Sequence, residues 1–436
     1  MTSGQKANVV RPLCAALLAL MCGASPTHAQ LRGHGGPVRA VAVSADGQSA
    51  ISGSFDTSAI VWSLASDTAE SVLRFHDGAV NAVAFLKDGR MATAGADARI
   101  AIWRPGEEAP VQVLEGHHGP IVALAASPDG AWLASGAWDQ TARLWTVDGK
   151  EWRILEGHRQ NVNGLAFMPD GHALVTVGYD ASLRIWPITR NDPPTIVTLP
   201  APLNTVAVAI DGEILTGAAD GHVYFISPSG QRRGQVGGAD APISALALAP
   251  NGRWVAAASI QGDIMVIERP SHAVVRALAG RGLPVWSATF LPDNSTLLTG
   301  GGDGIIRHWS IRSGGPVGAT LLAPPDDPLA AYPGDAGAQV FRACVACHTL
   351  SFERGNRAGP SLRGIFGRKI ATLPGYNFSP ALKKLDIVWT PETLSKLFEI
   401  GPTAYTPGTK MPEQRIDSAE DRRALVEFLK RATTKP

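Results

Sequence analysis

The chain has 436 residues, more than one ordinary hydrophobic core organises, so we expect more than one domain. It is rich in Gly (47) and Pro (32), poor in aromatic residues (6%) and nearly neutral (+1), which argues against a disordered chain or a helical bundle and favours turn-rich β structure. The nearly neutral net charge combines two regions of opposite charge. Residues 30–333 carry 21 basic and 28 acidic side chains, whereas residues 334–436 carry 16 basic and 10 acidic ones.

The first element is a short apolar run at residues 13–22, preceded by Lys6 and Arg11 and followed by Thr27-His28-Ala29. The run is about half as long as the roughly twenty residues that span a bilayer, so a retained anchor is the weaker alternative. We expect residues 1–29 to be a signal peptide and the mature protein to be periplasmic, without a membrane span.

Two of the four cysteines, Cys14 and Cys22, lie in that removable segment, which leaves Cys344 and Cys347 in the mature chain. An exported protein with one close pair of cysteines has no disulfide framework. These two thiols therefore need a specific explanation.

A repeat occupies the next three hundred or so residues. Large residues close successive β-rich segments at intervals of 39 to 42 residues: Trp62, Trp103, Trp145, Trp186, Phe225, Ile267 and Trp309. A tight-turn dipeptide such as Asp46-Gly47 or Asp88-Gly89 precedes each marker, which predicts a hairpin there. The spacing therefore predicts seven units of short strands.

The repeat resembles the WD-repeat family, whose signature is supplied by Gly33-His34, Gly116-His117 and Gly157-His158 together with the closing Trp residues. The resemblance implies a seven-bladed all-β propeller over residues 30–322. It also implies that a Ser or Thr, an Asp and a His in each of the first four blades form a buried hydrogen-bond network rather than a hydrolase triad. These residues are Ser52, Asp56 and His34; Thr93, Asp97 and His76; Ser135, Asp139 and His117; and Thr176, Asp180 and His158.

This signature weakens along the chain. The fifth unit keeps Thr216 and Asp220 without the His, the sixth has Ala257 and Gln261, and the seventh has Arg281 where a His is expected. We therefore expect the later blades to be looser. We also expect residues 317–322 to form the outer strand of the seventh blade, so that this blade closes within itself.

A hypothetical partner-binding patch lies on the top face that the resemblance implies for the propeller. Its members are Arg39, Phe55, Trp138, Tyr179 and Trp286, with Asn81, Asn163 and Asn204 between them. Grouped aromatic and Arg side chains are typical of protein-docking surfaces. The alternative, which the sequence leaves open, is that these rings pack between blades.

A Pro-rich segment at residues 323–333 predicts a linker, after which residues 334–436 begin with a helical pattern that ends in Cys344-Val345-Ala346-Cys347-His348. One helical turn places the two sulfurs and the imidazole on one side, where they can form two thioethers to a haem and ligate its iron. A dithiol redox pair and half of a zinc site are the alternatives, but no Cys or His follows His348.

Met411 is the one methionine after the propeller, and its setting in Pro407-Gly408-Thr409-Lys410-Met411-Pro412 predicts a stiff turn that aims its thioether at the iron. We expect His348 and Met411 to be the two axial ligands. Core filling is the alternative role of Met411, and Lys410 is a substitute ligand at high pH.

From Gly337 to Lys430 the domain resembles the small all-α class I cytochromes c, which implies one covalently attached haem c. The resemblance places the Pro360 carbonyl as the acceptor from the axial His. It places Arg368, Tyr376 and Trp389 near the haem propionates, and it brings Gly337 and Phe341 of the first helix against Leu425 and Phe428 of the last. Phe378 and Leu382 depart from the family pattern by replacing polar residues.

An iron with two axial ligands has no vacant position, so we expect one-electron transfer to a redox protein partner, guided by lysines such as Lys369, Lys383, Lys384 and Lys396. The propeller would be the docking platform, and nothing indicates nucleic acid or a small-molecule substrate. The alternative is a catalytic dehydrogenase or reductase propeller that exchanges electrons with the haem, although His222, His272 and His308 are scattered and no vicinal cysteine pair is present. A sensor or an assembly factor is a third class, so whether the chain is itself an enzyme stays open.

Overall fold

The computed structural model describes residues 1, 30–107, 109–190, 192–238, 241–278, 283–317, 329, 331–342, 344, 348–350, 356–357, 359–374, 376, 378, 380–407, 409, 411, 415–416 and 418–433. The predicted signal peptide after Met1, most of the predicted linker, and Arg281 lie outside these residues. No helix in the described ranges is long and apolar enough to cross a membrane.

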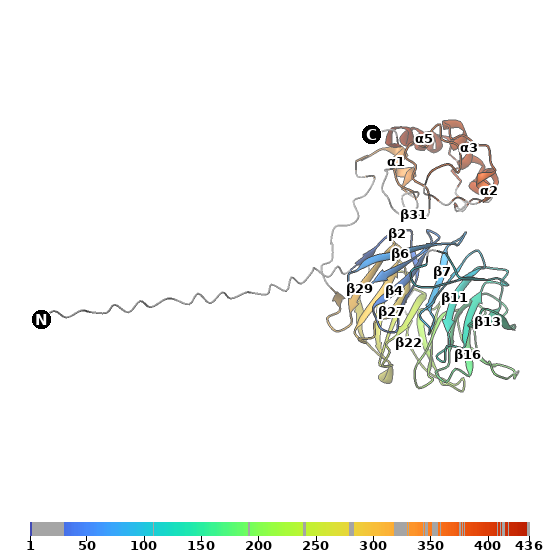
Figure 1. The fold of residues 1–436 in the computed structure, drawn as a ribbon, viewed down its shortest axis with the longest axis vertical. Helices are drawn as coiled ribbons and strands as arrows, with labels where there is room; N and C mark the ends of the chain where they lie inside the picture. Colours follow the sequence, from blue (N-terminus) through green and yellow to red (C-terminus); the bar gives the residue numbers. More distant parts are fainter. Residues whose placement is uncertain are drawn as a thin grey trace.

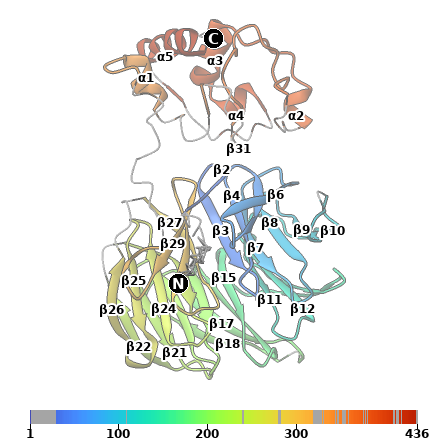
Figure 2. The same ribbon diagram turned by 60° about the vertical axis from the view of Figure 1, so that its left-hand side comes forward.

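Seven antiparallel sheets are arranged radially in the described part of residues 30–317, as the repeat predicts (Figures 1 and 2). Each sheet corresponds to one unit of the repeat, and the first strand of each unit packs against the first strands of its neighbours, β27 against β3 included. The seven-bladed propeller is therefore confirmed.

Blades 1 to 3 consist, from the centre outwards, of β3 (Val38–Val43), β4 (Ser49–Ser54), β5 (Ser58–Ser63) and β6 (Thr68–Arg74); β7 (Val80–Phe85), β8 (Met91–Gly95), β9 (Ile100–Trp103) and β10 (Gln112–Leu114); and β11 (Ile121–Ala126), β12 (Trp132–Ala137), β13 (Ala142–Thr146) and β14 (Glu151–Leu155). Blades 4 and 5 consist of β15 (Val162–Phe167), β16 (Ala173–Gly178), β17 (Ser182–Pro187) and β18 (Thr195–Thr198); and β19 (Leu203–Val208), β20 (Ile214–Ala218), β21 (His222–Ile226) and β22 (Arg232–Gly237). Blade 6 consists of β23 (Ile243–Leu248), β24 (Trp254–Ser259), β25 (Ile264–Glu268) and β26 (Ala273–Leu278), with the 3-10 turn η1 (Arg269–Ser271) before its last strand.

Blade 7 is closed by the start of the chain. Its strands β27 (Val285–Phe290), β28 (Thr296–Gly301) and β29 (Ile305–Ser310) are joined by β1 (Gln30–Arg32), in which Leu31 lies opposite Ile306. The short β30 (Gly315–Pro316) pairs only with the far end of β29. The expected closure of this blade within itself is therefore wrong, because β1 occupies the outer edge of β29 at residues 305–307; of the segment 317–322 that was expected there, residues 318–322 lie outside the described part of the chain. Three residues before Gly33 are enough, because Leu31 is fully buried and pairs along the first half of β29.

The His network forms in the first four blades as the resemblance implies. In blade 2 His76 places Nδ1 3.0 Å from a carboxylate oxygen of Asp97 and Nε2 2.8 Å from the Thr93 hydroxyl, to which Trp103 also donates at 3.0 Å. Corresponding bonds occur in blades 1, 3 and 4. Every polar group of each set has a partner inside the sheet, which is the arrangement of a structural network and not of a reactive triad.

Two later blades keep part of this network in altered form. In blade 5 the Tyr224 hydroxyl donates to Asp220 at 2.6 Å. The sequence motif includes Asp220 but not Tyr224. In blade 7 Trp309 donates to Thr299 at 2.8 Å, while Asp303 pairs with Arg307 of the same hairpin. The missing histidines are thus replaced by bonds within one blade.

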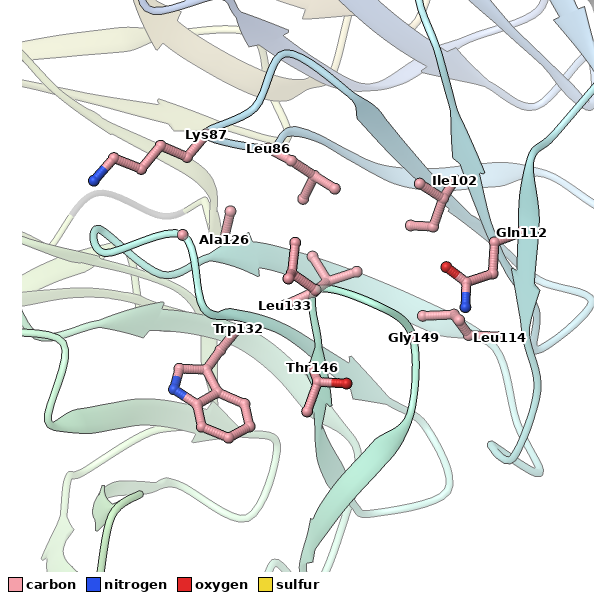
Figure 3. Close-up of a pocket in the computed structure, with 12 residues that line it drawn as sticks. Leu86, Lys87, Ile102, Gln112, Leu114, Ala126, Trp132, Leu133, Thr146 and Gly149 are labelled. Carbon is pink, nitrogen blue, oxygen red and sulfur yellow. The ribbon is translucent and has the colours of Figure 1, made fainter.

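The blades pack tightly against each other. Leu86, Ile102, Leu114 and Leu133 fill the space between blades 2 and 3 (Figure 3), and the gap that remains is about 10 Å³, room for one water at most. This gap is a packing defect rather than a ligand site.

The C-terminal domain is helical. Its helices are α1 (Ala336–Phe341), α2 (Pro380–Lys383), α3 (Pro391–Ile400), α4 (Pro402–Tyr405) and α5 (Ala419–Thr433). The Asp335 side chain caps α1 by accepting from the Ala338 N–H at 3.0 Å, and Thr390 forms a capping box with Thr393 at the start of α3.

Helices α1 and α5 cross at backbone contact. A Cβ atom on Gly337 would lie 2.1 Å from the Ala424 carbonyl oxygen, so only glycine fits there, and the rings of Phe341 and Phe428 lie 5.5 Å apart. The predicted contact between the terminal helices is confirmed, and Leu425 is fully buried beside it. The small helical domain predicted for residues 334–436 is thereby confirmed in its fold class.

Candidate functional site

The turn after α1 places Cys344 and His348 on one side of the chain. The Cys344 N–H donates to Phe341 at 2.7 Å, and the His348 N–H donates to the Cys344 carbonyl at 2.9 Å. These bonds continue the helical spacing, so a buried sulfur and an imidazole lie one turn apart. Cys347 lies outside the described residues.

The His348 ring is fixed in orientation. Its Nδ1 atom donates to the Pro360 carbonyl oxygen at 2.8 Å, so Nε2 is the ring nitrogen that carries no proton and is free to accept or to ligate. The backbone of Gly359 lies against the same ring, since a Cβ there would be 2.4 Å from Cε1. The loop at residues 359–360 therefore determines both the tautomer and the position of the imidazole.

The predicted haem residues that the structure describes all border one cavity of about 470 Å³. They are Cys344, His348, Pro360, Arg368, Tyr376, Trp389 and Met411. Buried Leu362, Ile365, Leu394 and Phe398 supply apolar walls. A thiol, an imidazole and a thioether within an apolar cavity of this size fit a covalently held, flat macrocycle with an iron at its centre.

Met411 is held by a short series of turns after α4. Its N–H donates to the Thr409 hydroxyl at 3.1 Å, and the Thr409 N–H donates to Thr406 at 3.0 Å. The Thr406 hydroxyl in turn donates to Pro402 at 2.8 Å. The segment thus brings the thioether to the cavity from a different element than His348. Lys410 lies outside the described residues.

The predicted propionate side of the cavity carries a half-buried cation, Arg368. The Arg368 guanidinium donates to the carbonyls of Arg363 (3.1 Å) and Ser361 (2.9 Å), and burial lowers the pKa of Arg368 from its ordinary value. Backbone bonds tie this segment to Trp389. Phe378, one of the departures from the family pattern, packs its ring 4.6 Å from that of Tyr376, and Leu382 also borders the cavity.

Six propeller residues that the sequence did not assign to the haem site border the same cavity: Phe55, Thr57, Asp77, Gly78, Ala79 and Ala96. The sequence placed Phe55 in the docking patch instead. No signal in either domain's motifs could have found this group, because each motif encodes one domain and not the contact between two.

The other four members of the predicted docking patch border a separate cavity of about 550 Å³ at the centre of the propeller: Arg39, Trp138, Tyr179 and Trp286. Trp138 and Tyr179 are about half exposed, at 47% and 51%. The side chains of Asn81, Asn163 and Asn204 each donate to a carbonyl of the next blade, so they join blades. Docking by this patch stays a prediction.

The three histidines considered for a catalytic propeller lie apart. His222 is 3.2 Å from Asp220, His272 stacks on Phe225 with ring centres 3.8 Å apart, and His308 lies 3.8 Å from Asp67. In the described ranges no group of three or more His, Cys, Asp or Glu side chains could hold a metal ion. Lys369, Lys383, Lys384 and Lys396 are exposed, and Lys369 pairs with Asp386 at 2.8 Å.

Comparisons with known proteins match each domain separately. The family described as "WD domain, G-beta repeat" matches residues 25–63, 68–104, 108–146, 149–187 and 273–310, and the family described as "Cytochrome c" matches residues 334–433. Blade 5 and the first three strands of blade 6, where the sequence signature is weakest, fall outside the first match.

Relatives of the C-terminal domain include the cytochrome c of Cochliobolus lunatus, 42% identical over 103 residues that cover 23% of this chain and 94% of the relative. The cytochrome c of Arabidopsis thaliana is 42% identical over 103 residues, covering 23% and 91% of the two chains. That of Sesamum indicum is 38% identical over 106 residues, covering 24% and 95%.

Proposed function

This chain belongs to the cytochrome c family, and from that premise we propose that it is an exported one-electron carrier whose haem iron is ligated by His348 and Met411 and whose propeller docks a redox partner. The cytochrome domain carries one covalently attached haem c. Bound haem supplies an iron that gains and loses one electron.

The observation that carries the proposal is that Cys344, His348 and Met411 border one apolar cavity. Pro360 holds Nε2 of the imidazole free for the iron, and the loop after α4 presents the thioether. With both axial positions taken, oxygen and peroxide have no place to bind, which favours electron transfer over oxygen chemistry.

Export is supported by the composition of residues 1–29, in which Lys6 and Arg11 precede the apolar run. Strand β1 begins at Gln30, so cleavage after Ala29 would leave the closure of blade 7 intact. Export to an oxidising compartment also agrees with a mature chain that keeps only the cysteines of the haem motif.

The docking role is supported by the half-exposed rings of Trp138 and Tyr179 beside a central cavity. The exposed lysines on the cytochrome domain would guide an acidic partner over about a Debye length, roughly 8 Å at physiological salt. A partner held by the propeller would react at the high local concentration that tethering gives.

Replacing Met411 tests the ligand set. We expect Met411→Ala to lower the midpoint potential and to let added imidazole bind the iron, since Met ligation raises the potential and closes the site. Leu382→Ala is the matched control, because it removes an apolar side chain from the same cavity without removing a thioether. Imidazole that binds the wild type as readily as Met411→Ala would contradict His/Met ligation.

Docking has its own test. The haem-loaded mature protein should retain a redox protein from the native exported fraction at low salt, and a Trp138→Ala, Tyr179→Ala double variant should release it. A small metabolite that reduces the wild-type haem with no protein partner would instead favour a catalytic propeller.

A further inference from the structure

The haem cavity has a wall that belongs to the propeller. Phe55 and Thr57 lie in the turn between β4 and β5, Asp77 to Ala79 lie before β7, and Ala96 follows β8. All of them border the cavity that Cys344, His348 and Met411 border from the other side. A single cavity is thus shared by two domains.

Backbone pairing joins the domains beside this cavity. Strand β2 (His34–Gly35) pairs in parallel with β31 (Asn356–Arg357), with His34 opposite Asn356 and Gly35 opposite Arg357. Both views show β2 and β31 between the propeller and the helical domain (Figures 1 and 2). The contact therefore involves blade 1 in two places: β2, which leads into its first strand, and the turn between β4 and β5.

Among the described residues, the propeller's share of the cavity lining comes from blades 1 and 2. The residue before the repeat acid or amide occupies an equivalent place in every blade, and in blades 1 and 2 it is Phe55 and Ala96, which border the haem cavity. In blades 3 and 4 it is Trp138 and Tyr179, which border the central cavity instead. Equivalent positions thus border different cavities: Phe55 and Ala96 border the haem cavity, and Trp138 and Tyr179 border the central cavity.

The Phe55 ring packs against the guanidinium of Arg39. The guanidinium of Arg39 lies 5.5 Å from the centre of the Phe55 ring and 4.6 Å from that of Trp286. Arg39 Nε is buried and has no hydrogen-bond partner among the described residues, and the guanidinium lies over both rings. The stack supports a ring that is 44% exposed beside the haem cavity.

The charges of the two domains favour the same contact. Residues 30–333 have an excess of acidic side chains and residues 334–436 an excess of basic ones. At the cavity, Asp77 comes from the propeller and Lys369 from the cytochrome domain, and each also has an ion pair within its own domain. Long-range attraction therefore draws these faces together.

We propose that the propeller is part of the haem site: Phe55, Thr57 and the Asp77 to Ala79 loop cover the cavity on one side, so that the haem there faces its own propeller and not an external partner. This inference rests on the haem site of the proposed function. It means that a partner reaches the haem from the uncovered side or by displacing the blade 1 and blade 2 loops.

Two matched positions test the proximity. Thr57 and Ala181 both follow the repeat Asp, both have left-handed backbone (φ 67° and 59°) and both are half-buried, but only Thr57 borders the haem cavity. With Cys344 and Cys347 consumed by thioethers, Thr57→Cys or Ala181→Cys would be the single reactive thiol of the mature, haem-loaded chain. A fluorescent dye attached there is quenched by a nearby haem through energy transfer.

The dye at position 57 should be quenched several-fold more than the dye at position 181. Equal quenching would overturn the proposal, because the two sites would then be equally far from the haem in solution. The absorption spectrum of each labelled protein reports haem attachment independently, so a chain without haem would refute the proposed function and not this contact.

A second pair tests the cover itself. Phe55→Ala should speed the reduction of the haem by hydroquinone, a small neutral probe, several-fold. Ile260→Ala should leave the rate unchanged, because Ile260 occupies the equivalent place before Gln261 in blade 6, is 38% exposed and borders the central cavity instead. Thermal unfolding of both variants checks that the propeller is intact. An unchanged rate in Phe55→Ala, with the fold preserved, would show that Phe55 does not shield the haem.

Discussion

His348 Nδ1 donates to the carbonyl oxygen of Pro360 at 2.8 Å, and the backbone of Gly359, directly before Pro360, lies against the same imidazole. This bond connects the cysteine motif to a segment twelve residues later in the chain. It fixes which ring nitrogen of His348 carries the proton, so the loop prepares the imidazole for its proposed role as an iron ligand.

Gly359→Ala should disturb this arrangement. The added Cβ would lie 2.4 Å from His348 Cε1, and overpacking of this kind costs about 1–3 kcal/mol. We expect a lower melting temperature of the haem-loaded cytochrome domain and a changed haem spectrum. Gly315→Ala is the control, since a Cβ there meets nothing within 4 Å. Equal behaviour of the two variants would contradict the steric role of Gly359.

Thr93→Val should destabilise the propeller. Thr93 is fully buried, and its hydroxyl bonds both His76 and Trp103, so valine leaves two buried nitrogens without this partner at a cost of about 1–3 kcal/mol. Thr216→Val in blade 5 is the matched control, because the equally buried Thr216 hydroxyl donates to the Thr205 carbonyl and has neither His nor Trp beside it. Denaturant unfolding measures both, and a larger loss in Thr216→Val would refute the network's role.

Closure by β1 makes Leu31 a core residue of blade 7. Leu31→Ala should lower the free energy of unfolding by about 2–5 kcal/mol, since Leu31 is fully buried against β29. Val317 is half-buried and begins the segment that the sequence favoured for closure, so Val317→Ala should cost clearly less. A larger effect at Val317 would restore the closure of the blade within itself.

Acid should weaken blade 2 in a defined pH range. Burial alone would raise the pKa of Asp97, but the hydrogen bond and charge of His76 outweigh it and lower the pKa from 3.8 to about 2. A lowered carboxyl pKa stabilises the fold above the ordinary value, and this contribution is lost as pH falls from 3.8 towards 2. The stability difference between wild type and Asp97→Asn should therefore shrink over that range. A difference independent of pH would exclude Asp97 as the titrating group.

Much of the fold follows from local pattern. Trp62, Trp103, Trp145 and Trp186 each mark one sheet, because each of these four units repeats the same hairpins and the same buried hydrogen bonds. Likewise the turn from Cys344 to His348 needs only helical geometry. Both features depend on residues close together in the chain.

What could not be predicted depends on contacts between distant segments. The pairing of Leu31 with Ile306 joins the two ends of the ring, and three residues carry too little pattern to announce a strand. Tyr224, in the strand that follows Asp220, donates to this carboxylate in place of a histidine, and no motif encodes this substitution. The sequence pattern places Phe55 in a docking surface, and it misses the haem cavity because that contact depends on how two folded domains meet.

The most direct test of the account is an optical redox titration of the folded, mature protein. A separate sample is denatured first, to show whether the haem stays attached to the chain. The account predicts one haem per chain that survives denaturation and, in the folded protein, a single reversible one-electron transition. Haem that is lost on denaturation, or a folded protein whose spectrum does not change with applied potential, would contradict it.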